Sequence, residues 1–316
     1  MELHHVRYFV AVIDNGSISA AASALGVAQP SISQALRTLE RELHIRLFHR
    51  VGRGMVATSA GHALIGPARK ILRDIAVAEG TVRDAEGDFR GRLEIRSHPA
   101  VSSGTLPQLV AEFLRRNPKV TVEIGVMHDE STVAGLIHNA VCEIVVTHLP
   151  LDQSIDATES NRVLDVFELG AQEFWIAYPP GADFPDHDPL PWAELDTPLV
   201  ATPRGALAAD EITRMLPPAQ AARRPAAILE NREARLAFAL AGVGAALIER
   251  SMAGVARAGG AHTRAFTPPL TLPYGLVFDR NNLSPAAAAF VDLARDQVAK
   301  ESCSATARNA SAAGES

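Results

Sequence analysis

Cysteine is almost absent from this sequence: the 316 residues include only Cys142 and Cys303. Two cysteines so far apart exclude a disulfide framework and a cysteine-rich zinc site, and their scarcity is typical of a reducing compartment. A redox switch made by this pair is disfavoured, because a sensor cysteine needs exposure and a lowered pKa. We expect Cys142, which lies beside a predicted strand, to be a small buried hydrophobic residue.

Long apolar runs and a secretion signal are also missing. No stretch of about 18 uncharged apolar residues occurs, so we expect no transmembrane helix. The first residues, Met1 to His5, lack a basic patch followed by an apolar run, and the chain is therefore expected in the cytoplasm. With 316 residues it is too long for one ordinary compact core, which predicts two or three folding units.

The motifs of common enzyme classes are missing as well. We find no Gly-x-Ser-x-Gly elbow, no phosphate-binding glycine-rich loop and no His-Glu-x-x-His metal motif. Scattered His, Ser and Asp residues do not make a catalytic triad without geometry. The sequence therefore predicts no enzyme activity, no catalytic residues and no cofactor.

Charge is distributed unevenly along the chain. The formal net charge is −6, yet residues 1–92 carry 12 Lys and Arg against 9 Asp and Glu, whereas the remainder carries 18 against 27. A mildly basic head on an acidic body is compatible with local nucleic-acid contact. The asymmetry is too small to decide the function alone.

Three short helices are predicted in the head. Apolar residues from Leu3 to Ile13 recur at helical spacing, and Asn15-Gly16 ends that helix. Ser17 is expected to cap an alanine-rich helix over residues 18–25, which Gly26 ends. Pro30 then opens a third helix that runs to about Leu43. The second and third helices with their tight turn predict a helix-turn-helix.

The outward face of the third helix carries hydrogen-bonding side chains suited to base edges and phosphates in a major groove. An ordinary amphipathic surface helix, which remains the alternative, would more often carry Glu/Lys pairs. Beyond it, residues 47–50 and 55–57 flank Gly52-Arg53-Gly54 and predict a hairpin whose arginines contact the phosphate backbone. The predicted DNA-binding residues are Gln29, Pro30, Ser31, Ser33, Gln34, Arg37, Arg50 and Arg53.

The head resembles the signature of the LysR-type transcriptional regulators. The similar residues are Phe9-x-Ala11-Val12, Gly16-Ser17-Ile18-Ser19-x-Ala21-Ala22-x-x-Leu25-x-Val27-x-Gln29-Pro30-Ser31-Ile32-Ser33, Leu39-Glu40, Leu47-Phe48-x-Arg50 and Thr58-x-x-Gly61. Ala28 departs from the family, which often has Ser or Thr there, so a side-chain cap worth about 1 kcal/mol is missing. The resemblance implies a winged helix-turn-helix that binds double-stranded DNA at an inverted-repeat operator.

A long linker helix capped by Thr58 is predicted to run to about Asp84, with a kink near Pro67. Its apolar residues follow roughly a heptad pattern. In the family this helix pairs with a second chain, which implies a homodimer, with a tetramer left open, through Leu64, Ile71 and Ile75. The alternative is that the stripe packs on its own domain.

Strands and helices alternate after residue 91, which predicts a mostly parallel α/β sheet covered by helices. The order resembles the two-lobed, periplasmic-binding-protein-like effector domain of the same family. Family-like pieces include Leu106-Pro107, Asn117-Pro118 and Leu240-x-Gly242-x-Gly244, whereas Glu143 and Glu249 depart from the usual Asp and Pro. The predicted domains are 1–58 (winged helix-turn-helix), 59–90 (linker helix and connector), 91–300 (effector domain) and a disordered tail, 301–316. Within the effector domain, lobe one spans 91–162 and 266–300, and lobe two spans 163–265.

Open α/β sheets bind ligands at the carboxyl ends of their strands, where helix N-termini supply donors. The candidate effector-binding residues at these ends are Ser97, His98, Ser102, His128, Thr147, His148, Thr202, Pro203 and Arg204. By resemblance, Thr147 and Thr202 occupy positions that commonly touch the effector. Hydroxyls, helix N-termini and the Arg204 guanidinium predict a small anion, most plausibly a carboxylate, although Asp129 and Glu130 nearby oppose it.

His98, His128 and His148 follow three of these four strands, which makes a metal or pH sensor conceivable. No fixed short spacing supports a metal site, so the sequence predicts none, and the histidines are expected to be ordinary polar cleft residues. A solute-binding protein would share the effector domain's shape, but it would lack the helix-turn-helix and carry a secretion signal.

Overall fold

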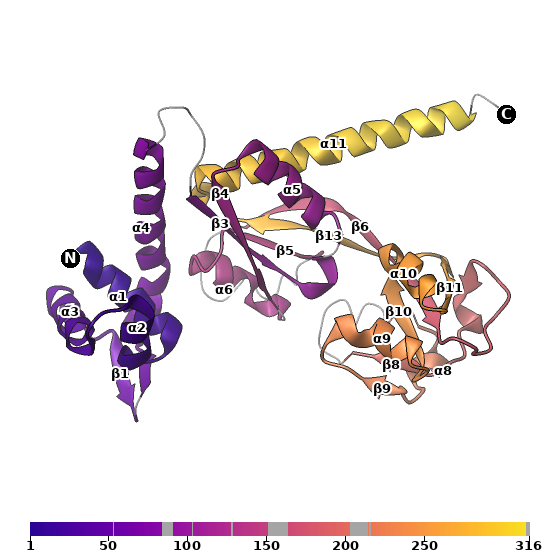
Figure 1. Cartoon of the computed structure of the whole chain (residues 1–316), viewed down its shortest axis with the longest axis horizontal. Helices are drawn as coiled ribbons and strands as arrows, with labels where there is room; N and C mark the ends of the chain where they lie inside the picture. The colour runs from indigo at the N-terminus through magenta and orange to yellow at the C-terminus, as the bar shows by residue number, and fades with distance from the viewer. Residues whose placement is uncertain are drawn as a thin grey trace.

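The computed structural model describes residues 1–52, 54–83, 91–102, 104–127, 129–150, 164–202, 214 and 216–313. It consists of a helical head with a long helix α4, followed by two α/β lobes that share one sheet (Figure 1). In the described part of the chain no single helix is long and apolar enough to cross a bilayer, and only α1 and α2 taken together, bent by 115°, meet that test.

The head contains the three predicted helices, α1 (Leu3–Asn15), α2 (Ile18–Leu25) and α3 (Gln29–Glu42). The Ser17 hydroxyl accepts a hydrogen bond from the Ala20 N–H at 3.2 Å, which confirms the predicted cap. Gly16 ends α1 in the left-handed region, at φ 68°, where a side chain is strained. Ala28 precedes α3 without a side-chain cap, as the sequence predicts. The apolar faces of the helices meet around the fully buried Phe9.

The predicted hairpin is formed by β1 (Phe48–Val51) and β2 (Gly54–Ala57), which pair antiparallel. The Met55 N–H donates to the Gly16 carbonyl at 2.9 Å, so the hairpin is attached to the end of α1. The Glu40 carboxylate accepts from the Leu47 N–H at 2.8 Å and from the Phe48 N–H at 3.2 Å. These bonds fix the hairpin relative to α3, as a wing requires.

Helix α4 (Ser59–Arg83) is continuous past Pro67 and begins at the predicted cap, since Thr58 Oγ1 accepts from the Gly61 N–H at 3.0 Å. Ile65 and Ala68 are buried in the head core, and Leu64 packs against it. Part of the apolar stripe is thus covered by the chain's own head. Ile71 and Ile75 are half-buried.

The effector domain is a central sheet with helices on it. Its strands run in the order β4-β3-β5-β13-β6-β10-β8-β9, and β11 adds to β6. The elements not yet given are β3 (Gly91–Ser97), η1 (Pro99–Val101), α5 (Leu106–Arg116), β4 (Val120–Val126), η2 (Glu130–Thr132), α6 (Val133–His138), β5 (Ile144–His148), β6 (Asp165–Tyr178), β7 (Leu190–Pro191), η4 (Trp192–Glu194), β8 (Leu199–Ala201), α8 (Pro218–Ala221), β9 (Ala227–Ile228), η5 (Arg232–Ala234), α9 (Arg235–Leu240), β10 (Ala245–Glu249), η6 (Arg250–Met252), α10 (Ala253–Ala258), β11 (His262–Arg264), β12 (Phe266–Thr267), β13 (Leu270–Phe278), η7 (Arg280–Asn282) and α11 (Pro285–Ala313).

The sheet is mixed, which corrects the prediction of a mostly parallel one. Strands β4, β3 and β5 are parallel in lobe one, and β10, β8 and β9 are parallel in lobe two. The long strands β6 and β13 pair antiparallel between them. The reason is topological: the chain crosses to lobe two along β6 and returns along β13, so the two crossings run in opposite directions. The predicted lobe boundaries fall near the ends of these strands.

The chain end also differs from the prediction. The sequence predicts a helix to about Lys300 and disorder beyond it, whereas α11 continues to Ala313. Figure 1 shows α11 covering lobe one and then running on past α5. The composition explains this, because no Gly or Pro interrupts residues 286–313 and alanine has the highest helix propensity. Low hydrophobicity alone was a poor indicator of disorder here.

Candidate DNA-binding surface and effector pocket

The exposed face of α3 carries the predicted DNA-binding residues. Gln29, Pro30, Ser31, Gln34 and Arg37 are exposed, and Ser33 is half-buried. The opposite face buries Ile32, Ala35, Leu36 and Leu39 in the head core. The helical period therefore separates the two groups, as expected of a recognition helix. No acidic residue lies in the first turn of α3, so its positive dipole end remains available to an anion such as a phosphate.

Of the two arginines predicted on the wing, the structure describes one. Arg50 is exposed on β1, opposite Met55 on β2. Arg53, the other predicted phosphate contact, lies outside the described residues. A guanidinium held on a hairpin that is hydrogen-bonded to both α1 and α3 has the geometry to contact a phosphate while α3 occupies a groove.

The predicted strand-end residues of lobe one come together. Ser97 ends β3 and His98 follows it directly, Thr147 and His148 end the neighbouring β5, and all four residues are buried. Ser102 donates a hydrogen bond to Ser97 Oγ at 2.9 Å and lies directly after η1 rather than at a helix start. Helix α5 starts only at Leu106, so Ser102 is not at its N-terminus.

Two polar residues that the sequence analysis did not assign complete this cluster. Glu130 Oε1 accepts from Thr147 Oγ1 at 3.3 Å and lies 3.7 Å from His148 Nδ1. Gln172, in the middle of β6, places Oε1 2.9 Å from His148 Nε2 and donates through Nε2 to the Ala100 carbonyl at 2.5 Å. His98 and His148 are thus part of a buried network rather than ordinary polar cleft residues.

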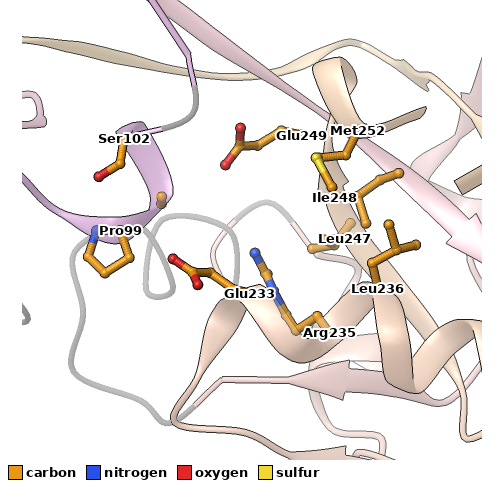
Figure 2. Close-up of a pocket in the computed structure, with 10 residues that line it drawn as sticks. Pro99, Ser102, Glu233, Arg235, Leu236, Leu247, Ile248, Glu249 and Met252 are labelled. Carbon is orange, nitrogen blue, oxygen red and sulfur yellow. The ribbon is translucent and has the colours of Figure 1, made fainter. Parts of the chain in front are cut away.

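A pocket lies between the two lobes, with a volume of about 290 Å³. Figure 2 shows η1 on one side and, on the other, an apolar wall of Leu236, Leu247 and Ile248. The carboxylates of Glu233 and Glu249 and the guanidinium of Arg235 point toward its middle (Figure 2). The lining residues are Pro99, Ala100, Ser102, Glu233, Arg235, Leu236, Leu247, Ile248, Glu249 and Met252.

Of the predicted effector-binding residues, Ser102 lines this pocket. Ser97, His98, Thr147 and His148 lie in the buried network, which contacts the pocket wall through Ala100. Thr202 follows β8, is half-buried and is not among the lining residues. His128, Pro203 and Arg204 lie outside the described residues.

The lobe-two lining was missed by the sequence analysis. Glu249 ends β10, so the strand-end rule that selected Thr202 applies to it equally. Glu233 lies in η5 and Arg235 is the first residue of α9, in a segment where the sequence predicted only a helix. The expectation of an anion site rested on strand ends without acidic residues, whereas the described lining of this pocket contains two carboxylates and one guanidinium.

Helix α4 contacts lobe one directly. Arg69 donates to the Asn139 carbonyl at 3.3 Å, and Arg73 donates to the Ala140 carbonyl at 3.1 Å. Arg73 Nη1 also lies 3.9 Å from Glu143 Oε1, and that carboxylate accepts from the Ser284 N–H at 2.6 Å. Burial raises the pKa of Glu143, and Arg73 partly opposes the shift. One helix therefore belongs to the head core and touches the effector domain.

Cys142, near these contacts, is buried as expected, and burial raises the pKa of its thiol to about 12.

Comparisons with known proteins agree with this architecture. The family model for the LysR substrate binding domain matches residues 86–299, and that for bacterial regulatory helix-turn-helix proteins of the lysR family matches residues 3–62. The chain is 26% identical over 295 residues to the transcriptional regulator ClcR of Pseudomonas putida, covering 93% of this chain and 98% of ClcR. It resembles the crystal structure of CbnR, a LysR family transcriptional regulator, with a TM-score of 0.66, 24% identity and coverage of 94% and 99%. CbnR has also been solved in complex with its target DNA, and that structure has a TM-score of 0.64, 23% identity and coverage of 94% and 99%. With both parts of the architecture matched by models of one family, the chain belongs to the LysR family of DNA-binding transcriptional regulators.

Proposed function

We propose that this regulator controls transcription in response to a small organic effector that binds between the two lobes. The observation that carries the proposal is the 290 Å³ pocket to which both lobes contribute. An effector that binds one lobe arrangement more tightly shifts the population toward it. Helix α4 contacts lobe one through Arg69 and Arg73, so a change in lobe one reaches the head through a packed element.

The pocket favours an effector that carries a carboxylate together with a positive group. Arg235 is the counter-charge for the carboxylate, because a guanidinium forms strong charge-assisted hydrogen bonds. Glu233 and Glu249 match an amine or another cationic group, and the wall of Leu236, Leu247 and Ile248 accommodates an apolar body. This refines the sequence-based expectation of a carboxylate effector.

On DNA, α3 is proposed to lie in the major groove, with Gln34 or Arg37 contacting bases and Gln29, Ser31 and Ser33 close to the groove edge. Arg50 and Arg53 of the hairpin are proposed to contact phosphates. The exposure of the α3 side chains and of Arg50 supports this division.

A homodimer is proposed to form through α4, with Leu64, Ile71 and Ile75 contributing. Two-fold symmetry then places two α3 helices on one face of the DNA and requires an inverted-repeat operator. The half-buried state of Ile71 and Ile75 supports the proposal only in part, because Leu64 is already packed on the head. Because a regulator must bind chromosomal DNA, the protein is proposed to act in the cytoplasm, and it is proposed to have no enzyme activity.

The effector proposal is tested by a thermal-shift screen of full-length protein against small carboxylates, amines and zwitterionic amino acids. Hits are then measured with Arg235→Gln and with a matched control, Arg250→Gln, which removes an exposed arginine of the same lobe that pairs with Glu173. Binding that is weakened only by Arg235→Gln supports the proposal. The proposal is contradicted if the hits raise the melting temperature of Arg235→Gln as much as they raise that of the wild type and of Arg250→Gln.

The DNA assignment is tested by binding to operator and random DNA at several salt concentrations. Arg50→Ala should weaken both by a similar factor and lower the salt slope by about 1, because one phosphate contact is lost. Arg37→Ala should lose more on the operator. Equal proportional losses in both variants contradict the division of roles.

A further inference from the structure

Two buried histidines of lobe one and a buried carboxylate bring metal-ligating atoms close together. His98, Glu130 and His148 each offer one ligand atom, and these three atoms lie within 4.8 Å of one another. All three residues are at most 6% exposed. They come from the end of β3, from η2 and from the end of β5, so the sheet pairing and not sequence spacing brings them together.

The protonation of His148 follows from its neighbours. The Ala100 carbonyl can only accept, so the amide nitrogen of Gln172 faces it and Gln172 Oε1 faces His148. Nε2 of His148 must therefore carry the proton that it donates to Gln172 Oε1. In the neutral ring this leaves a lone pair on Nδ1.

That lone pair has no suitable partner among the described residues. His148 Nδ1 is buried, has no hydrogen-bond partner in the described part of the chain and lies 3.7 Å from Glu130 Oε1. Both atoms are acceptors when the imidazole is neutral and the carboxylate ionised, and a buried, unpaired acceptor facing a carboxylate is costly. A positive charge between the two atoms removes the conflict, and a ligand atom of His98 lies within 4.8 Å of those of Glu130 and His148.

We propose that His98, Glu130 and His148 bind a divalent first-row transition-metal ion, with Zn²⁺ as the first candidate. Two imidazoles and one carboxylate are the ligands that such ions prefer, whereas Mg²⁺ and Ca²⁺ prefer oxygen ligands alone. Tetrahedral zinc with these ligands requires donor atoms about 3.3 Å apart. The three ligand atoms lie within 4.8 Å of one another, so small side-chain rotations that bring them to this spacing complete the site.

The site lies directly behind one wall of the effector pocket. His98 Nδ1 accepts a hydrogen bond from the Ala100 N–H at 3.3 Å, and Pro99 and Ala100 line the pocket. The Gln172 side chain is hydrogen-bonded both to His148 Nε2 and to the Ala100 carbonyl. It therefore fixes the orientation of a metal-binding imidazole without itself being a ligand. The ion is thus distinct from the organic effector and supports the wall that contacts it.

The experiment uses full-length protein freed of metal by a chelator. Co²⁺ is titrated while its visible absorption is recorded, and Zn²⁺ is then added as a competitor. The wild type should bind one ion per chain with a tetrahedral spectrum that Zn²⁺ removes. His148→Gln and Glu130→Gln keep polar groups in place and should weaken binding more than about 100-fold, since even outer partners of metal ligands cost 10–100-fold.

The matched control is His187→Gln, which removes another histidine–carboxylate pair. His187 Nδ1 lies 2.6 Å from Glu194 Oε2, but both are exposed and belong to no cluster of three ligands among the described residues. This variant should bind the ion as the wild type does. Thermal melting of the metal-free variants and their binding to DNA establish that they are folded.

A crystal of the wild type soaked in Zn²⁺ provides a test that needs no variant, because anomalous scattering should locate the ion between the three side chains. Lack of one-to-one binding by the wild type, equal affinity in His148→Gln, or an ion located elsewhere overturns the proposal. Since metal binding is measured without effector or DNA, its failure leaves the proposed effector function standing.

Discussion

The two walls of the interlobe pocket differ in how they are held and in what they present. On the lobe-one side, the η1 backbone lines the pocket while the polar groups behind it, His98 and Gln172, are buried and hydrogen-bonded to Ala100. On the lobe-two side, Glu233, Arg235 and Glu249 extend charged groups into the space itself (Figure 2). The lobe-one wall is thus held by buried hydrogen bonds behind it, whereas the lobe-two wall carries the charged side chains.

This difference assigns a separate property to each wall. Rigid support behind η1 preserves the shape of the pocket, because each buried polar group there depends on a partner. In the proposed function, the charged side chains of lobe two select the chemistry of the ligand, because their charged ends lie at the pocket and not in a core. Changes on the lobe-one side should therefore alter stability first, and changes on the lobe-two side should alter affinity first.

The largest expected effect comes from Gln172→Leu. It removes two hydrogen bonds and leaves the Ala100 carbonyl and His148 Nε2 buried without partners, which should lower the free energy of unfolding by about 3 kcal/mol. Gln220→Leu in lobe two is the matched change: it removes one hydrogen bond, to the Thr197 carbonyl, together with an amide oxygen that lacks a partner among the described residues. It should cost about 1 kcal/mol. Urea denaturation compares them, and equal losses would contradict the proposed asymmetry.

A smaller effect on stability but a clear one on affinity is expected for Arg235→Gln. Losing a charge-assisted hydrogen bond should weaken effector binding by about 2 kcal/mol, roughly 30-fold, with little change in the unfolding midpoint. Calorimetric titration of an effector identified by the screen measures this. A variant that melted far below the wild type would show instead that Arg235 supports the wall rather than the ligand.

The smallest expected effect is a pH dependence in lobe one, at Glu143. Burial raises the pKa of this carboxyl above 4.5, so the folded state binds its proton more tightly than the unfolded state does. The resulting stabilisation is fully present below pH 4.5 and is lost as the pH rises through the folded pKa. The free energy of unfolding of the wild type should therefore fall over this window relative to Glu143→Gln, as measured by denaturation at several pH values. Parallel pH profiles would contradict the assignment.

The sequence predicted the ends of the second and third helices of the head to within about one residue, because local signals determine where these helices begin and end. Ser17, Gly16, Gly26 and Thr58 each act within a few residues through a cap or a left-handed turn. The exposed face of α3 follows from the same helical period. Such signals require no knowledge of distant residues.

In the effector domain, such local signals predicted only some of the site residues. The strand-end rule found Ser97, His98, Thr147 and His148, because β3 and β5 are neighbouring parallel strands. It did not find Gln172, which lies in mid-strand and 24 residues beyond the histidine it contacts. The pocket residues of α9 and β10 were missed because their position opposite η1 depends on how β6 and β13 carry lobe two, and no local pattern encodes that.

The two crossing strands have a consequence for transplanting this sensor. β6 and β13 pair along most of their lengths, from Asp165 with Phe278 to Phe174 with Leu270. Gly275 faces the Phe167 carbonyl so closely that an added Cβ would lie 2.3 Å from that oxygen. A graft of lobe two onto another regulator must therefore carry β6 and β13 together as one β-ribbon, with Gly275 retained. A graft that took only one of the two strands would leave that strand without its partner and expose an unpaired strand edge. The unit of exchange in this domain is the ribbon, not the lobe.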